Sequence, residues 1–197
     1  MSALAARATI NPRRYTYSDY EKWPDHPRYE LIKGEVTLLS SPSQHHQAML
    51  IELSTQFRSF LRGKECKVFA VPFDVRLNFD TLDNTVLQPD LLVVCDLDKL
   101  NGKHCLGAPD MIAEILSPST ARKDTLVKSK LYMDAGVKEF WIIDPFHRLV
   151  VVHILENGSY FTSYHGSEEV IPIKVLKGFS VNMADVFEEA PPDVAQI

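Results

Sequence analysis

The chain has 197 residues, of which 45% are hydrophobic and 24% charged, and its formal net charge is -5. These values are ordinary for a globular protein with one full core, and the acidic balance excludes charge-driven coating of nucleic acid, although a local cleft can still be positive. No apolar run approaches the roughly 20 residues that span a bilayer, and residues 1–7 reach an arginine too early for a secretory signal, so we expect a cytoplasmic protein with no membrane partner.

The chain contains three cysteines, Cys66, Cys95 and Cys105, with no CxxC spacing. An odd and scattered set fits a reducing compartment better than a disulfide framework or a zinc site. We therefore predict free thiols, in agreement with a cytoplasmic location.

The first part of the chain predicts a tail, a strand pair and a helix. We interpret residues 1–15 as a loose tail, and residues 29–39 are typical of two short strands joined at Gly34. A helix begins near Gln44 and ends at Gly63, because apolar residues between them recur at three- and four-residue steps. This apolar face consists of Met49, Leu50, Leu53, Phe57, Phe60 and Leu61.

Three β-rich runs follow the helix, at residues 68–77, 86–94 and 111–116. The second and third are continuously apolar apart from one acidic residue in each. Such runs are typical of strands that are covered on both faces of a sheet.

The last part of the chain predicts a helix, a buried strand and a hairpin. The hydroxyl residues at 117–120 indicate a helix start, and Gly136 supplies its end. Residues 139–144 form a further buried strand, and Asn157-Gly158 is a strong hairpin turn.

This order of elements predicts an α/β or α+β fold. A mixed sheet is flanked by helices, with an N-terminal strand pair and a C-terminal β-hairpin added. No repeat or flexible linker divides the chain, so we predict one domain over residues 16–187, between the tail at 1–15 and a second tail at 188–197.

The acidic residues of the two apolar runs, Asp90 and Glu114, are the first candidates for chemistry. Buried carboxylates are costly unless something pairs with them. If the two strands are neighbours, both carboxylates can share a hard cation such as Mg²⁺ or Mn²⁺, with the backbone carbonyl of Ile115 as a further ligand. The alternative is that each acid faces solvent at a strand end or pairs with an arginine.

A second group of candidates lies at four-residue steps on the following helix: Asp124, Lys128 and Tyr132 share one helical face. Spacing alone favours a surface ion pair between Asp124 and Lys128, with Tyr132 in the core. Lys130 is a competing lysine about 200° around the helix from Lys128, so the two cannot reach one site.

Three further polar residues receive weaker interpretations. Glu30 lies between Tyr29 and Leu31, and we expect a solvated strand acid rather than a metal ligand. His45 and His46 open the first long helix about 100° apart, which does not make a metal pair, so a polar helix start is the better interpretation.

Taken in order, these motifs resemble the Uma-two family of restriction endonucleases, within the PD-(D/E)XK nuclease superfamily. The resemblance covers roughly residues 15 to 187. It is carried by residues 29–35, 42–46, 88–90 and 114–120, by Asp124, Lys128 and Tyr132, and by residues 136–145.

The resemblance implies a restriction-endonuclease-like core of order α-β-β-β-α-β, with Asp90 and Glu114 as its acidic metal ligands. The superfamily usually places a lysine two residues after the second acid, where this chain has Leu116. The resemblance implies that Lys128 takes over that role, and that Glu30 is an additional acid near the pocket.

The implied activity is Mg²⁺- or Mn²⁺-dependent hydrolysis of DNA phosphodiester bonds, with Lys128 orienting water or offsetting charge in the transition state. A homodimer would suit cleavage of both strands. One alternative is a degraded site on the same fold that only binds nucleic acid. Another is an oligomeric scaffold formed through the hairpin at residues 148–164, whose edge could pair with a second copy.

Overall fold

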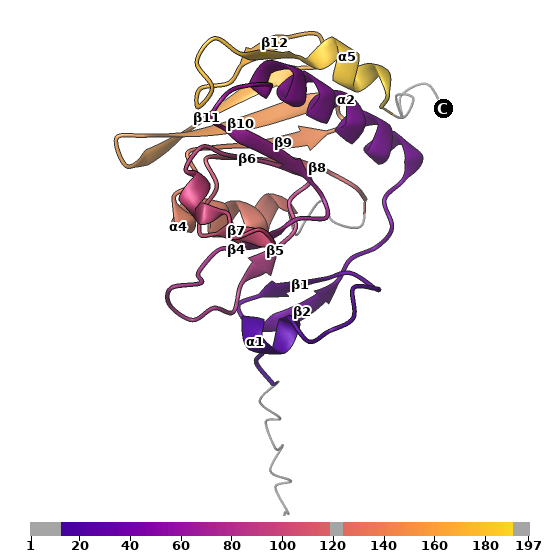
Figure 1. The fold of residues 1–197 in the computed structure, drawn as a ribbon. Helices are drawn as coiled ribbons and strands as arrows, with labels where there is room; N and C mark the ends of the chain where they lie inside the picture. The colour runs from indigo at the N-terminus through magenta and orange to yellow at the C-terminus, as the bar shows by residue number, and fades with distance from the viewer. Residues whose placement is uncertain (1–12, 119–123, 191–197) are drawn as a thin grey trace, which may run out of the picture.

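The computed structural model describes residues 13–118 and 124–190, which form three sheets, and Figure 1 shows helices on both sides of the largest one. The larger sheet has strand order β11-β10-β9-β8-β6-β3 and is antiparallel except for the parallel pair β8–β9. Its strands are β3 (Lys67–Ala70), β6 (Leu91–Val94), β8 (Met111–Ile115), β9 (Glu139–Asp144), β10 (Leu149–Glu156) and β11 (Ser159–Gly166).

The smaller sheet has strand order β2-β1-β5-β4-β7, and a separate two-stranded sheet pairs β12 with β13. Their strands are β1 (Tyr29–Ile32), β2 (Glu35–Leu38), β4 (Asp74–Arg76), β5 (Val86–Leu87), β7 (His104–Leu106), β12 (Val170–Pro172) and β13 (Ser180–Asn182). The helices are α1 (Tyr17–Tyr20), α2 (Gln44–Leu61), the 3₁₀ turn η1 (Leu97–Lys99), the π-helical segment η2 (Asp124–Lys128), α4 (Ser129–Ala135) and α5 (Met183–Glu188).

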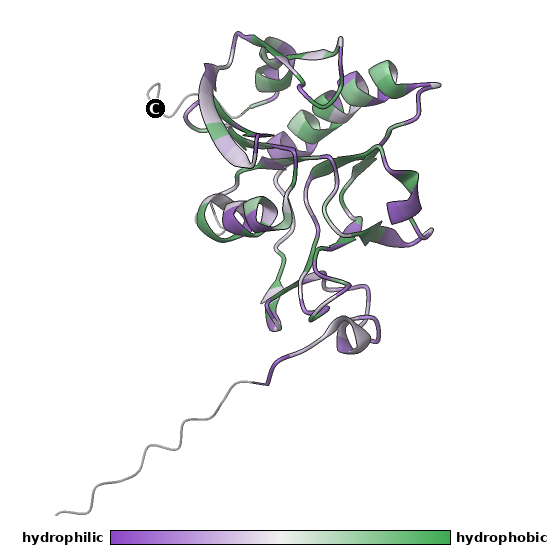
Figure 2. Cartoon of the chain, turned by 90° about the vertical axis from the view of Figure 1, so that its left-hand side faces the viewer, coloured by the Kyte–Doolittle hydropathy of each residue, from purple (hydrophilic) through white to green (hydrophobic). Residues whose placement is uncertain are grey.

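The central strands of the larger sheet are buried on both faces, as their continuous apolar runs predict. One face packs against α2 and α5, and its core includes Leu53, Phe57 and Trp141. The other face packs against α4 and the smaller sheet, and its core includes Leu92 and Phe140. Figure 2 shows that hydrophobic residues follow these strands. The predicted mixed sheet flanked by helices is confirmed.

Several local predictions are also confirmed. Helix α2 begins at Gln44, where the Ser43 hydroxyl accepts the His46 N–H, and its predicted apolar face is buried, with Phe60 only partly so. Gly34 has φ 82° in the turn between β1 and β2. Gly158 has φ 78° in the turn of the β10–β11 hairpin, a conformation that glycine adopts readily.

Two predicted strands are each divided between the two sheets, which corrects the prediction. The run at residues 68–77 becomes β3 and β4, and the run at 86–94 becomes β5 and β6. A proline interrupts each run, Pro72 in the first and Pro89 in the second. Proline has no N–H to donate, so the ladder stops there and the chain crosses to the other sheet.

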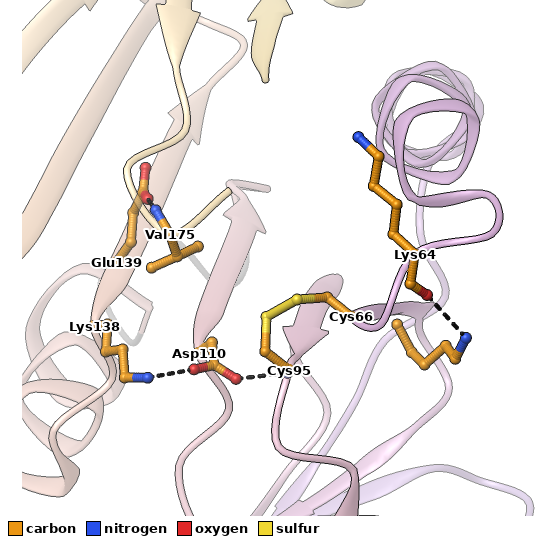
Figure 3. Close-up of a disulfide and its surroundings, with 8 residues drawn as sticks. Lys64, Cys66, Cys95, Asp110, Lys138, Glu139 and Val175 are labelled. Carbon is orange, nitrogen blue, oxygen red and sulfur yellow. Dashed lines mark hydrogen bonds and ion pairs between the residues drawn. A yellow bond between two sulfur atoms is a disulfide. The ribbon is translucent and has the colours of Figure 1, made fainter. Parts of the chain in front are cut away.

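The prediction of three free thiols is wrong. Cys66 and Cys95 form a disulfide at the ends of the neighbouring strands β3 and β6, as Figure 3 shows. Cys105 is a free, buried thiol, and burial raises its pKa to about 11.

The domain boundaries stay a prediction, because residues 1–12 and 191–197 lie outside the described part of the chain. Within the described part, no helix combines the length and the hydropathy that crossing a bilayer requires.

Candidate functional site

A cleft of about 380 Å³ lies where the chain crosses between the two sheets. It is lined by the first turn of α2, by Gln88 and Asp90, by the end of β8 and by Lys128. Asp90, Glu114, Ile115 and Lys128, four of the five predicted site residues, therefore line a single cavity.

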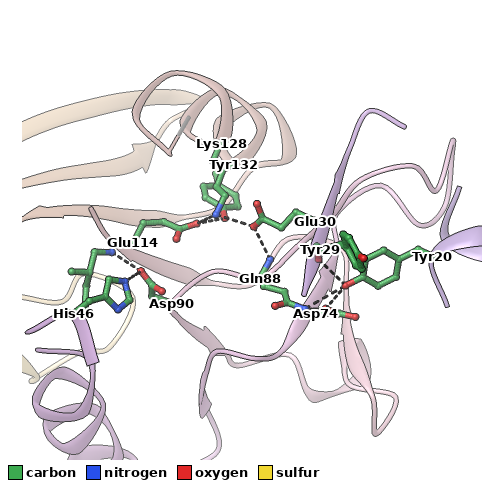
Figure 4. Close-up of polar contacts among 11 residues, drawn as sticks. Tyr20, Tyr29, Glu30, His46, Asp74, Gln88, Asp90, Glu114, Lys128 and Tyr132 are labelled. Carbon is green, nitrogen blue, oxygen red and sulfur yellow. Dashed lines mark hydrogen bonds and ion pairs between the residues drawn. The ribbon is translucent and has the colours of Figure 1, made fainter. Parts of the chain in front are cut away.

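Asp90 directly precedes β6 and is held in place by two hydrogen bonds. Its Oδ2 accepts the backbone N–H of Ile115 at 2.8 Å and contacts Nε2 of His46 at 3.1 Å. The register of β6 on β8 sets Leu91 opposite Ala113, so Asp90 lies beside the end of β8, where Glu114 is located (Figure 4). The predicted strand neighbourhood is therefore present.

Glu114 and Glu30 share one buried lysine. The Lys128 ammonium lies 3.0 Å from Oε1 of Glu114 and 2.8 Å from Oε1 of Glu30. The side chains are only 4%, 0% and 5% exposed for Glu114, Glu30 and Lys128. Burial of two carboxylates around one ammonium is stable only because further donors complete their hydrogen bonds.

Two donors meet that need. The Tyr132 hydroxyl donates to Oε1 of Glu114 at 2.6 Å, and the backbone N–H of Gln88 donates to Oε1 of Glu30 at 3.0 Å. Burial, and then the Glu114 charge, raise the pKa of Tyr132 well above its ordinary value. Tyr132 therefore remains a hydroxyl donor at neutral pH.

The structure decides between the two candidate lysines. Lys128 points at the acidic residues, whereas Lys130 pairs with Asp134 on the surface and its side chain is 70% exposed. The interpretation of Lys128 as a surface support is therefore wrong, and Tyr132 is buried with a polar contact to Glu114. The Asp124 side chain lies outside the described residues.

Glu30 and His46 also differ from their sequence interpretations. Glu30 is fully buried rather than solvated, and it lies behind Lys128 rather than in the wall of the cleft. His46 is a cleft residue that contacts Asp90, not merely a polar helix start. One sequence signal could have found it: His46 precedes Met49 and Leu50 by three and four residues, so it lies on the buried face of the helix.

The donor set of this cleft fits a hard divalent cation. Asp90 and Glu114 offer carboxylate oxygens, and the carbonyl of an extended residue such as Ile115 points to the same side as its N–H, which here faces Asp90. Glu30 and Glu114 both contact Lys128, and Asp90 accepts the Ile115 N–H beside them. Within the described ranges, no group of three or more His, Cys, Asp or Glu side chains forms a metal-holding cluster, so a cation would depend on backbone and water ligands as well.

Comparisons with known proteins identify the family and the fold. The family model Uma2, described as putative restriction endonuclease, matches residues 17–184. Over 116 residues the chain is 28% identical to slr1290, an uncharacterised protein of Synechocystis sp.. The match covers 58% of this chain and spans only 60% of that protein's length.

A solved structure shares the fold. The crystal structure of a putative nuclease belonging to DUF820 from Anabaena variabilis superposes with a TM-score of 0.73 at 19% sequence identity. The superposition covers 89% of this chain and 98% of that one. Since the family model spans well over half of the sequence, the chain belongs to the Uma2 family of putative restriction endonucleases.

Proposed function

We propose that this protein is a divalent-metal-dependent endonuclease that hydrolyses phosphodiester bonds in DNA. The proposal rests on one observation: Asp90, Glu114 and Lys128 line the same cleft. Each carboxylate there is held by a hydrogen-bond donor, the Ile115 N–H for Asp90 and the Tyr132 hydroxyl for Glu114. The family supports a nuclease, while the metal and the DNA substrate are our own proposals.

Asp90, Glu114 and the Ile115 carbonyl would hold Mg²⁺ or Mn²⁺. When bound, such an ion supplies Lewis-acid polarisation of the phosphoryl group and a lower pKa for a coordinated water. The protein contributes the alignment of the ligands. His46 and the Ile115 N–H fix Asp90, and Tyr132 and Lys128 fix Glu114.

Lys128 takes the place of the lysine that is missing at Leu116. Its ammonium contacts Glu30 and Glu114 and lines the cleft. A donor placed beside developing negative charge is worth about 2.7–4 kcal/mol in comparable sites. Glu30 is not itself among the lining residues of the cleft but contacts Lys128, so we assign it the role of positioning Lys128.

The first turn of α2 gives the acidic chain a local site for phosphate. The cleft is lined by Ser43, His45, His46 and Gln47 at the start of this 18-residue helix. A helix N-terminus presents free N–H groups and the positive end of the helix dipole. Arg28 adds a positive side chain to the same wall.

Cleavage of supercoiled plasmid tests the function directly. We expect wild-type protein with Mg²⁺ or Mn²⁺ to nick or linearise the plasmid, and EDTA to stop the reaction. Asp90→Ala should be inactive while keeping the wild-type circular dichroism spectrum. If Asp90→Ala cuts as well as wild type, the assignment of the site is wrong; an RNA substrate of the same sequence tests the preference for DNA.

A degraded, binding-only site is the second candidate, and the ion pairs of Lys128 favour it. The ammonium already offsets part of the carboxylate charge that a cation would otherwise neutralise. Calorimetric titration with Mn²⁺ separates the two functions: a catalytic site binds the ion and loses that binding in Glu114→Gln, whereas a degraded site releases no binding heat.

We further propose a homodimer. Strand β11 is an edge strand of the larger sheet and exposes Phe161 and Tyr164, at 59% and 69%. Unpaired edges are templates for association with a second copy. The mass from light scattering of wild type, compared with a Phe161→Lys variant, tests this edge.

A further inference from the structure

A second cavity, of about 410 Å³, adjoins the catalytic cleft, and Arg28 and Gln88 line both. We call it the aromatic pocket. Its lining side chains include Tyr17, Tyr20, Trp23, Tyr29, Asp74 and His104.

Three aromatic side chains of the pocket, Tyr20, Trp23 and Tyr29, pack against one another. The Trp23 ring is edge-on to Tyr29, with centroids 5.6 Å apart, and lies 5.4 Å from Tyr20. All three are only partly buried, so ring surface remains open to the pocket. Rings fixed in this way form a rigid wall for a flat apolar group.

The pocket also has an oriented polar edge. Asp74 Oδ1 accepts the Tyr20 hydroxyl at 3.1 Å and Nε2 of Gln88 at 2.9 Å, as Figure 4 shows. No hydrogen bond to Oδ2 of Asp74 is formed by the described residues. Because both Gln88 amide protons point toward the Asp74 side, its Oε1 is turned away, and this buried acceptor has no partner in the described structure.

A hydroxyl donor, Tyr17, lines the same pocket as these acceptors. Nε2 of His104 receives N–H groups from Arg76 at 3.1 Å and Asn101 at 2.8 Å, so the neutral ring carries its proton on Nδ1. That proton points at the Tyr17 hydroxyl oxygen, 3.4 Å away. The Tyr17 hydroxyl hydrogen is then available to a molecule in the pocket.

We propose that the aromatic pocket binds one unstacked nucleobase that carries an exocyclic amino group, from the strand whose phosphate lies at Asp90 and Glu114. This inference rests on the proposed function. The ring stacks on Trp23 or Tyr20, and the amino group donates to Asp74. Such stacking and carboxylate–amino pairing are established modes of base recognition.

The spacing and the charges favour this occupant. Gln88 lies two residues before Asp90, a reach of about 7 Å, which corresponds to about two stacked nucleotide steps. Glu21, Asp25 and Asp74 are nearly balanced by Arg28 and Lys103, so the lining charges fit a neutral group better than a phosphate. A cation is the competing occupant, because aromatic rings beside carboxylates also bind quaternary ammonium groups.

Binding without divalent metal tests the pocket independently of cleavage. Fluorescein-labelled single strands of about 12 nucleotides, a usual length for single-strand sites, are compared by anisotropy in EDTA: oligo-dC, oligo-dT and an abasic strand of equal charge. We expect oligo-dC to bind about tenfold more tightly than the abasic strand, and more tightly than oligo-dT. Unlabelled oligo-dC should also quench the emission of Trp23, since Trp141, the other tryptophan, is fully buried.

Matched variants locate the effect. Trp23→Ala should remove the preference for oligo-dC over the abasic strand, and Trp23→Phe should restore it. Asp74→Asn should remove the preference for dC over dT while stacking remains, which keeps the test valid if Trp23→Ala folds poorly. Phe79→Ala, which removes an exposed aromatic side chain outside the pocket, is the control and should change nothing.

Two results overturn the inference: equal binding of oligo-dC and the abasic strand, or quenching of Trp23 by tetramethylammonium chloride but not by oligo-dC. Plasmid cleavage without any base preference would refute base binding in the aromatic pocket but support the proposed endonuclease activity. A base preference without cleavage in Mg²⁺ or Mn²⁺ would support base binding in the aromatic pocket but refute the proposed endonuclease activity.

Discussion

The two ends of the β6–β8 pair each contain a buried carboxylate with a lysine partner, yet only one of these pairs lines the cleft that we propose as the active site. At one end Glu114 contacts Lys128, whose side chain is 5% exposed, and both line the cleft. At the other end Asp110 contacts Lys138, whose side chain is 64% exposed. A buried carboxylate is therefore a weak sign of function by itself.

The two ends differ in how their carboxylates are paired with donors. Asp110 accepts the Cys95 N–H at 2.6 Å and Lys138 at 2.6 Å, and the nearby Glu139 accepts Trp141 and Val175 (Figure 3). At this end, which we call the structural end, Asp110 and Glu139 each accept a backbone N–H of their own. At the site, Glu30 likewise accepts the backbone N–H of Gln88, but Glu30 and Glu114 share one lysine whose side chain is only 5% exposed. The two ends therefore differ in the burial of the lysine and in the cleft that this lysine lines.

The sharpest test exchanges one carboxylate at each end. Glu114→Gln should lose plasmid cleavage down to background, because it removes a ligand charge, while its fold persists through the remaining Lys128–Glu30 pair. Asp110→Asn should keep wild-type cleavage per folded molecule. Cleavage rates with Mg²⁺, normalised to the folded fraction, measure both. Equal losses in the two variants would mean that the ends do not differ in function.

The two lysines should differ in stability. Lys128→Met leaves two buried carboxylates without their cation and should lower the free energy of unfolding by about 3–5 kcal/mol. Lys138→Met removes a largely exposed partner and should cost at most about 1 kcal/mol. Urea unfolding followed by circular dichroism gives both values. Similar costs for the two variants would contradict the burial difference.

The disulfide belongs to the structural end, and its removal should leave the site intact. Cys66 and Cys95 close a loop with a sequence separation of 29 residues, for which the loop-entropy model gives about 3–4 kcal/mol. Cys66→Ser should lower the free energy of unfolding by that amount without changing cleavage at low temperature. A thiol titration finding three free cysteines in the unfolded, unreduced protein would show that the bond does not form.

The smallest expected effect is the pH dependence of Asp110. Burial alone raises the pKa of Asp110, but Lys138 and the Cys95 N–H outweigh it, so the pKa lies below its ordinary value. A lowered pKa means that the stabilisation is present above the unfolded pKa of about 3.9 and is lost as the pH falls through the folded pKa.

Asp110→Asn should therefore cost about 1–3 kcal/mol at pH 7, and the difference from wild type should shrink in acid below about pH 3.9. Urea unfolding of both proteins across this range measures it. A difference that stays constant with pH would show that the Asp110 charge contributes nothing.

Local patterns predicted the elements well, but not how the chain divides between sheets. Helix α2, the turn at Gly34 and the hairpin at Asn157 follow from short-range spacing and backbone preference. The split of residues 86–94 was missed because an apolar run resembles one strand, although Pro89 marks the break. The position of that break places Asp90 at a strand end, inside the cleft.

The sequence by itself determined the kinds of groups available: two acids in apolar runs, a lysine on the next helix and two histidines at the start of an earlier helix. Only the tertiary structure decided that Lys128 rather than Lys130 reaches those acids, that His46 contacts Asp90 and that Cys66 faces Cys95. The physical reason is the sequence distance over which each kind of interaction acts. Periodicity and propensity act over a few residues, whereas each of these contacts joins segments that meet only when the sheets and helices pack.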